Sequence, residues 1–327
     1  MASKKKLGLV AVAGAAALLA SAAVPAASQA ASQKTIAFVM GAINDPFFNA
    51  MKVGAEAEAK AKGVKLIWQG DVQYSPATQL PVVDQVLAQK PDGLVLIPTD
   101  PVALQPTIGK AKAAGIPVVN VDTHVNDLTD VVSFITGDNA DGGAKAADAL
   151  ANAMRYKAGQ KYQVVVGLTS ATATTNVARL EGFSKAIAAK YPGIQIVDKA
   201  YSQSDSAIAN TNVNNWLTKY PKLRGIFAID GTNATGAAAA IQSKGLIGKV
   251  ALVGYDAYPA NVKLVQKKVF AALIAQDPGA EAKQAIDTLL DVWAGKTSGI
   301  QKNVVIPNVV ISAATTKADL KKYTYVA

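Results

Sequence analysis

Four aspartates stand close behind short apolar segments of the chain. Asp122, Asp230 and Asp256 each follow such a segment directly, and Asp45 lies a few residues behind another. A carboxylate accepts hydrogen bonds from two hydroxyl groups, and a pair of carboxylates can also exchange protons with a substrate. These residues therefore indicate either a site for a polyhydroxylated molecule or an acid–base site.

The apolar segments themselves form a regular series. They lie at residues 35–40, 64–68, 93–97, 117–121, 162–168, 194–200, 225–229 and 249–255. Most are continuously apolar and rich in β-branched residues, and the stretches between them have helical spacing, as in 46–62 with Gly63 as a stop. Strands that are apolar on both faces and alternate with helices predict parallel sheets covered on two sides.

An internal repeat predicts two equivalent halves. Residues 87–100 and 217–230 share Leu, Pro and Asp at identical offsets, and each segment is followed by an Ala-rich helix, a glycine and a strand. The strand then ends at Asp122 in one copy and at Asp256 in the other. The chain of 327 residues also exceeds the size at which one core stops growing, so two lobes are expected.

The repeat also predicts where a ligand would bind. In open parallel sheets, ligands lie outside the carboxyl ends of the strands. Two such sheets that face each other place Asp45 and Asp122 opposite Asp230 and Asp256. The predicted cleft is lined by carboxylates and aromatic residues, and the separation of its aspartates onto two halves disfavours an acid–base pair.

Several classes of protein are disfavoured by composition. The chain has no cysteine and one histidine, His124, so neither a Cys/His metal cluster nor a histidine-based triad is expected. The formal charge of +10 is spread without basic runs, which argues against nucleic-acid binding. No G-x-G-x-x-G or G-x-S-x-G motif is found, and we expect no cofactor, no metal and no enzymatic activity.

The N-terminus is typical of a signal peptide. A basic MASKKK segment precedes a short apolar stretch and a small-residue stretch that ends at Ala30. We predict cleavage after Ala30, with Ala27 as the second choice, and a soluble periplasmic product. An uncleaved N-terminal anchor is the alternative.

The chain resembles the type I periplasmic sugar-binding proteins of ABC transporters, the group that includes the ribose-binding protein. The resemblance covers 34–311 and rests on NDPFF, IPTDPVAL, GIPVVNVD, GDNADGG, ARLEGF, IFAIDGTNATGA, LVGYD and IAQDPGAEA. It implies two Rossmann-like lobes with parallel sheets, joined by a three-strand hinge that crosses near Gly137, Gln276 and Pro307. The implied divisions are 1–30 for the signal peptide, 31–136 plus 277–306 for the N-terminal lobe, and 137–276 plus 307–327 for the C-terminal lobe.

The resemblance also implies a set of ligand contacts. The positions that match, or that flank a match, are Asp45, Phe47, Phe48, Asp122, Thr123, Gly137, Arg179, Asp230, Tyr255, Asp256 and Gln276. Phe47 has an alternative role in the core at the start of a helix, and Asp100 is expected to cap a helix rather than to bind. In WQGDVQY (68–74), Gln73 or Tyr74 is a candidate for the cleft mouth.

Departures from the ribose-type pattern concern the choice of sugar. Thr123 stands where that pattern carries an arginine, Ile97 replaces an asparagine, and a second basic residue gives way to SQSDS (202–206). Ribose itself is therefore in doubt.

The predicted function follows from the resemblance. The chain is expected to be a monomer that binds a small sugar or polyol and delivers it to an ABC transporter permease by hinge closure. A sugar sensor that docks on a chemoreceptor or sensor kinase is the alternative, and a carbohydrate-acting enzyme is a remote one.

Overall fold

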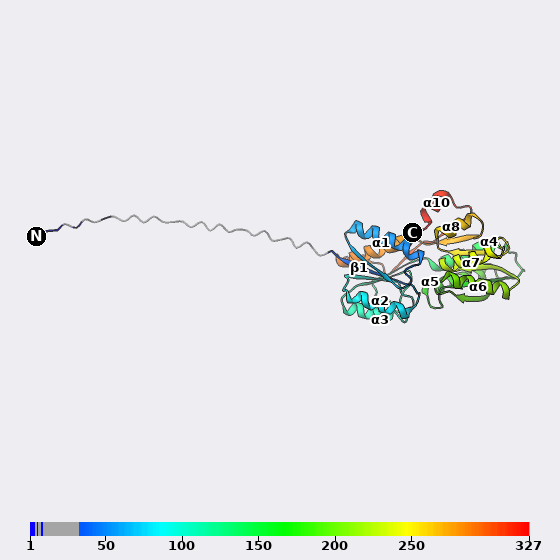
Figure 1. The fold of residues 1–327 in the computed structure, drawn as a ribbon, viewed down its shortest axis with the longest axis horizontal. Coiled ribbons are helices and arrows are strands. Elements are labelled where there is room, and N and C mark those ends of the chain that lie inside the picture. The colour runs from blue at the N-terminus through cyan, green and yellow to red at the C-terminus, as the bar shows by residue number, and fades with distance from the viewer. Residues whose placement is uncertain (4, 6–7, 9–32, 327) are drawn as a thin grey trace. The chain divides into compact units, whose positions relative to one another are not determined.

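The computed structural model describes residues 1–3, 5, 8 and 33–326, so the predicted signal peptide (1–30) falls almost wholly outside the described residues. Residues 33–326 contain two sheets of six strands, each flanked by helices (Figure 1). This arrangement confirms the predicted α/β fold with two mostly parallel sheets. No helix in the described part of the chain is long and apolar enough to cross a membrane.

The first sheet, called here the β1 sheet, has the order β11-β5-β4-β3-β1-β2 and is parallel throughout. Its strands are β1 (Thr35–Met40), β2 (Lys65–Gly70), β3 (Gly93–Leu96), β4 (Val118–Val121), β5 (Ser133–Gly137) and β11 (Asn303–Ile306). Its helices are α1 (Pro46–Lys62), α2 (Pro76–Ala88), α3 (Gln105–Ala113) and α9 (Pro278–Trp293), and a 3₁₀ turn (Thr297–Gly299) precedes β11.

The second sheet, called here the β6 sheet, has the order β12-β10-β9-β8-β6-β7, and β12 alone runs antiparallel to its neighbour. Its strands are β6 (Tyr162–Leu168), β7 (Ile194–Tyr201), β8 (Leu223–Ala228), β9 (Ala251–Tyr255), β10 (Ala272–Ala275) and β12 (Val309–Ser312). Its helices are α4 (Asn139–Ala153), α5 (Thr174–Lys190), α6 (Ser206–Lys219), α7 (Gly231–Ser243), α8 (Pro259–Gln266) and α10 (Lys317–Tyr323).

Continuous apolar strands form because both faces of each sheet are covered. In β1, Ile36 and Phe38 pack in one core cluster with residues of α1 and α9, whereas Ala37 and Val39 pack in another with residues of α2 and α3. All four side chains are fully buried. Successive side chains of a strand point to opposite faces, so an apolar residue is required at every position.

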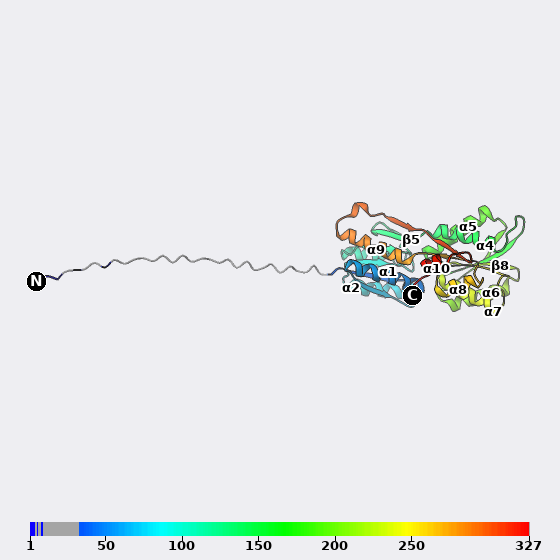
Figure 2. The same ribbon diagram turned by 90° about the horizontal axis from the view of Figure 1, so that it is seen from above.

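The chain passes between the two sheets three times. It leaves the β1 sheet after β5, returns to it after β10 through α9 and β11, and enters the β6 sheet again at β12. Figure 2 shows α9 beside α1, far from the helices that precede it in sequence. Residues near the passages are therefore held by both sheets.

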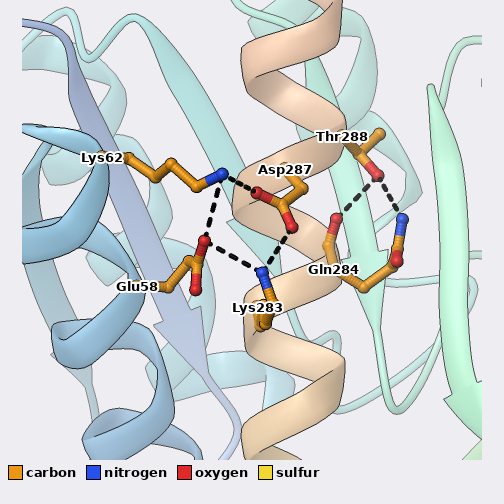
Figure 3. Close-up of polar contacts among 6 residues, drawn as sticks. All are labelled: Glu58, Lys62, Lys283, Gln284, Asp287 and Thr288. Carbon is orange, nitrogen blue, oxygen red and sulfur yellow. Dashed lines mark hydrogen bonds and ion pairs between the residues drawn. The ribbon is translucent and has the colours of Figure 1, made fainter.

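A network of charges joins α1 to α9 (Figure 3). Glu58 contacts Lys62 at 3.5 Å and Lys283 at 3.0 Å, and Asp287 contacts Lys62 at 3.2 Å and Lys283 at 2.8 Å. Each cation thus bridges both carboxylates, which connects segments more than 200 residues apart in sequence. The network fixes the returning helix α9 against the sheet that it rejoins.

Candidate functional site

A cavity with about 390 Å³ of free space, part of it open to solvent, lies where the carboxyl ends of both sets of strands meet. It is lined by Asp45, Phe47, Phe48, Tyr74, Asp122, Thr169, Thr175, Asn176, Arg179, Ser204, Asp230, Asp256, Tyr258 and Gln276. The site lies where the doubly wound topology predicts it.

Asp122 and Asp256 occupy equivalent positions in the two halves. Each follows the last residue of its strand and has a left-handed backbone, with φ of 60° and 65°. Their amides donate to Ile135 O and Ile274 O, both at 2.8 Å. Aspartate tolerates this conformation better than most residues, and the turn directs both carboxylates into the cavity.

Asp230 caps helix α7, and its carboxylate accepts four hydrogen bonds from residues of the β6-sheet elements. Its carboxylate accepts from Asn233 N at 2.9 Å, Asn233 Nδ2 at 2.7 Å, Thr232 Oγ1 at 2.8 Å and Thr169 Oγ1 at 2.7 Å. The helix N-terminus adds a favourable dipole. These bonds hold the Asp230 carboxylate in one orientation at the cavity wall.

Asp256 accepts hydrogen bonds from three separate segments. The donors are Gly231 N at 2.8 Å, Gln276 Nε2 at 2.8 Å and Tyr325 Oη at 3.0 Å. Tyr325 Oη also accepts from Gln276 N at 3.2 Å, so the C-terminal segment is attached to the passage that follows β10. Burial nevertheless raises the pKa of Asp256, even with the Arg179 guanidinium nearby.

Asp45 caps helix α1 and connects the two sets of elements. It accepts from Phe47 N at 2.9 Å, with Pro46 at the first helical position, and it also accepts from the Tyr258 hydroxyl. Tyr258 belongs to the segment that follows β9 in the other sheet. Burial raises the pKa of Asp45 to about 7, although both hydrogen bonds oppose the shift.

Asp122 differs from the other three aspartates. No hydrogen bond joins its carboxylate to another residue in the described part of the chain, yet only 8% of the residue is exposed. Burial raises its pKa to about 7, which the Arg179 charge opposes. Its oxygen atoms are therefore available to a ligand.

Arg179 is positioned by a close approach of α4 and α5. A β-carbon at Gly182 would lie 2.0 Å from Ala140 O, so only glycine permits the two helices to pack at this distance. Arg179 Nε donates to Asn139 Oδ1 at 2.7 Å and Nη1 to Ile229 O at 3.0 Å. Its Cζ lies 3.8 Å from the centre of the Tyr255 ring, so the guanidinium makes a cation–π contact with that ring.

Aromatic side chains wall the β1-sheet side of the cavity. Phe47 and Phe48 pack edge to face at 5.3 Å, and both are at least 95% buried. Phe47 lines the cavity and also belongs to the core, as its alternative role at the start of a helix predicted. Tyr74, which follows β2, lines the same side, and Tyr258 lines the cavity from the β6-sheet side.

Three of the predicted contact residues do not line the cavity. Thr123 Oγ1 donates to Pro98 O at 2.7 Å, and the Tyr255 hydroxyl accepts from Asn308 Nδ2 at 2.7 Å beneath Arg179. Gly137 lies at the first passage, where any side chain would come within 3.0 Å of polar atoms of Gln276 and Asn308. These three residues therefore contact neighbours of the lining residues, or the lining residues themselves, without lining the cavity.

Five lining residues were not predicted: Thr169, Thr175, Asn176, Ser204 and Tyr258. Thr169 and Ser204 follow strands β6 and β7, so a polar residue behind a strand was the available signal. Asp100 was expected to cap a helix, but it caps the turn that precedes α3: its carboxylate accepts from Val102 N at 2.9 Å and Ala103 N at 2.8 Å, and the helix itself begins after Leu104.

Comparisons with known proteins agree with this geometry. A profile described as periplasmic binding protein domain matches residues 36–297. The chain belongs to this family. This chain is 33% identical over 268 residues to the ribose import binding protein of Salmonella typhimurium, and the match covers 80% of this chain and 87% of that protein. The corresponding protein of Bacillus subtilis is 30% identical over 273 residues, covering 84% and 85%.

A solved structure extends the comparison to three dimensions. An ABC transporter solute binding protein from Agrobacterium vitis, bound with α-D-tagatopyranose, superposes with a TM-score of 0.83 at 29% identity. The match covers 90% of this binding protein and all of that chain. The resemblance predicted from sequence motifs is confirmed, and the relatives named here are binding proteins rather than enzymes.

Proposed function

We propose that this binding protein holds a small sugar or polyol in the cavity between its two sheets and delivers it to an ABC import permease. The proposal rests on the lining of the cavity. Carboxylates, a guanidinium and a carboxamide line it together with aromatic rings, and both sheets contribute residues. The carboxylates can accept hydrogen bonds from ligand hydroxyls, the guanidinium and carboxamide can donate to ligand oxygens, and the aromatic rings can pack on the apolar face of a sugar ring. The named relatives, two ribose import binding proteins and a tagatose-bound ABC transporter protein, support the same function.

Each lining group has a distinct part in this proposal. Asp122 accepts from ligand hydroxyls, because its carboxylate has no donor among the described residues. Arg179 donates from the part of its guanidinium that Asn139 and Ile229 leave free. Phe48 packs on the C–H face of the ligand. Charged partners make these hydrogen bonds about twice as strong as neutral ones.

We further propose that the described arrangement is the closed form of the protein. Two hydrogen bonds join the elements of one sheet to those of the other, one from Tyr258 to Asp45 and one from His124 N to Thr174 Oγ1 at 3.2 Å. A ligand that contacts both sides would stabilise the same arrangement, which links binding to closure.

The lobe boundaries and the export route belong to the same proposal. Lobes of 31–136 plus 277–306 and of 137–276 plus 307–327 are consistent with the strand membership of the two sheets. Cleavage after Ala30 would release the protein into the periplasm, where its relatives' family name places such proteins. Monomeric delivery to a permease completes the pathway.

A thermal-shift screen over pentoses, hexoses, deoxysugars and polyols tests the proposal, because a ligand of the folded state raises the melting temperature. At least one compound should stabilise the wild type, and Arg179→Gln should abolish that shift. The matched control is Arg155→Gln, since Arg155 is exposed and outside the cavity. No stabilisation by any compound, or an equal shift in Arg179→Gln, would contradict the proposal.

A further inference from the structure

The cavity carries an imbalance of charge. Four carboxylates line it, from Asp45, Asp122, Asp230 and Asp256, against the single guanidinium of Arg179. Arg179 takes part in none of the ion pairs found within 4.0 Å among the described residues, and the bonds of its Nε and Nη1 run to neutral oxygens. Buried charges that lack partners are costly, so the cavity is suited to a positive group.

Two of the carboxylates are already compensated by the protein. Asp230 accepts four hydrogen bonds at the N-terminus of α7, and Asp256 accepts three from Gly231, Gln276 and Tyr325. Their acceptor capacity is largely used, and they contribute negative charge rather than open binding positions.

The other two carboxylates are poorly compensated. Asp122 has no donor to its carboxylate among the described residues, and Asp45 has one amide and the Tyr258 hydroxyl. Burial raises the pKa of both to about 7, and each ionised neighbour raises it further. Without a ligand, both carboxyl groups are therefore partly protonated near neutral pH.

No other protein cation is available to these carboxylates in the described part of the chain. The groups that face them are Arg179 and the uncharged hydroxyls of Tyr74 and Tyr258, whose pKa burial raises. Glu281 interacts with Asp122 through its charge, and burial raises its pKa, but a carboxyl group supplies no positive charge in either protonation state. The ring of His124 is directed away, with Nδ1 at 2.7 Å from Val125 O.

The lining points to an organic cation rather than a metal ion. No group of three or more histidine, cysteine, aspartate or glutamate side chains among the described residues is arranged to hold a metal. The rings of Phe47, Phe48, Tyr74 and Tyr258 line the same cavity as the carboxylates. Aromatic faces attract ammonium groups and pack against carbon, whereas a bare metal ion would need further oxygen ligands.

We propose that the preferred ligand is a small polyhydroxylated molecule that carries a protonated amino group, an aminopolyol or amino sugar, with its ammonium beside Asp122. The inference rests on the proposed function, since it concerns the same cavity. An ammonium supplies three donors and one positive charge where the protein leaves acceptors and negative charge unpaired. The ligand hydroxyls then meet Arg179 and Gln276.

Matched pairs of compounds test the inference by isothermal titration calorimetry. The probes are 1-amino-1-deoxysorbitol with sorbitol and 1-amino-1-deoxyribitol with ribitol, because the amino groups of both aminoalditols are protonated at pH 8. In at least one pair the amino compound should bind at least about tenfold more tightly than its neutral partner at pH 8, the effect of one charge-assisted contact.

The variant Asp122→Asn keeps the shape of the side chain and removes its charge. It should reduce the preference for the amino compound to about threefold or less, whereas the exposed control Asp84→Asn should leave it unchanged. An aminoalditol keeps its proton up to about pH 10. Its affinity should therefore rise from pH 6 to pH 8 as Asp45 and Asp122 ionise, and the affinity of the neutral alditol should rise less, because a hydroxyl group brings no charge to these carboxylates.

The outcomes separate this inference from the proposed function. If neutral sugars or polyols bind as tightly as their amino partners in every pair, the inference is wrong and the proposed function stands. If neither these pairs nor the wider sugar screen yields a ligand, both are wrong. The comparison on wild-type protein remains decisive even if Asp122→Asn fails to fold.

Discussion

The hydroxyl of Tyr325 is predicted to stabilise the protein and to hold the site in its binding geometry. It donates to Asp256 Oδ1 at 3.0 Å and accepts from Gln276 N at 3.2 Å, in a position that is 94% buried. Tyr325→Phe removes both bonds and preserves the ring that packs on Phe47 at 6.1 Å.

The expected loss follows from the two groups left behind. A hydrogen bond to a charged acceptor contributes about 1.5–3 kcal/mol, and a buried amide without an acceptor costs about 1–3 kcal/mol. The lower ends together give about 2.5 kcal/mol, a large part of the 5–15 kcal/mol that stabilises a typical domain. Because Asp256 loses one of three bonds that orient it, ligand affinity should also fall about threefold to tenfold.

Urea unfolding and calorimetric titration with any hit from the sugar screen measure the two effects. The matched control is Tyr323→Phe, which removes a hydroxyl from the same C-terminal segment that contacts neither Asp256 nor Gln276. Equal stability and affinity in the two variants would refute the assigned role of Tyr325.

Three further predictions concern packing, pH and surface charge. Gly182→Ala should lower both stability and ligand affinity, because its β-carbon would meet Ala140 O at 2.0 Å and displace α5; wild-type affinity in this variant would contradict the positioning of Arg179. Since the folded-state pKa of Asp45 and Asp122, about 7, exceeds the unfolded value of about 3.9, the folded protein binds more protons between these values. These groups should therefore make the ligand-free protein more stable at pH 5 than at pH 8, and replacing both with asparagine should flatten that dependence in thermal melts; an unchanged slope would argue against buried carboxylates. Glu58→Gln should cost only about 0.5–1 kcal/mol and less at high salt in urea titrations, and a salt-independent loss would show that charge is not the cause.

Local sequence patterns predicted eight of the strands but not the four others that complete the two sheets. All eight apolar segments are strands, because buried parallel strands need apolar residues on both faces. The strands at 133–137, 272–275, 303–306 and 309–312 were not read from pattern. They are short, and β11 alternates exposed and half-buried residues at the edge of its sheet. Such segments depend on the neighbours that they pair with.

The charged residues of the site were predicted, whereas most of its neutral polar residues were not. Asp122, Asp230 and Asp256 were found because a carboxylate directly behind an apolar strand is conspicuous. Thr169 and Ser204 hold similar positions behind β6 and β7, but residues of these types occur in most loops. A position behind a strand was therefore not enough to predict a lining residue, because threonine and serine are too common in loops to be recognised there.

Side-chain direction at the turns also lay beyond the sequence. Thr123 follows Asp122, yet the left-handed turn at Asp122 directs the carboxylate into the cavity and the threonine hydroxyl to Pro98 O. Tyr255 precedes Asp256 and lies beneath Arg179 instead of in the lining. Adjacent residues therefore took different roles, and only the backbone geometry distinguishes them.

A crystal structure of the protein with the best ligand from the screens tests the central claim most directly. The account predicts the ligand in the cavity between the two sheets, with oxygen or nitrogen atoms within hydrogen-bonding distance of Asp122 and Arg179 and a carbon face against Phe48. A ligand bound elsewhere, for example in the groove beside Trp293, with the cavity unchanged, would contradict it.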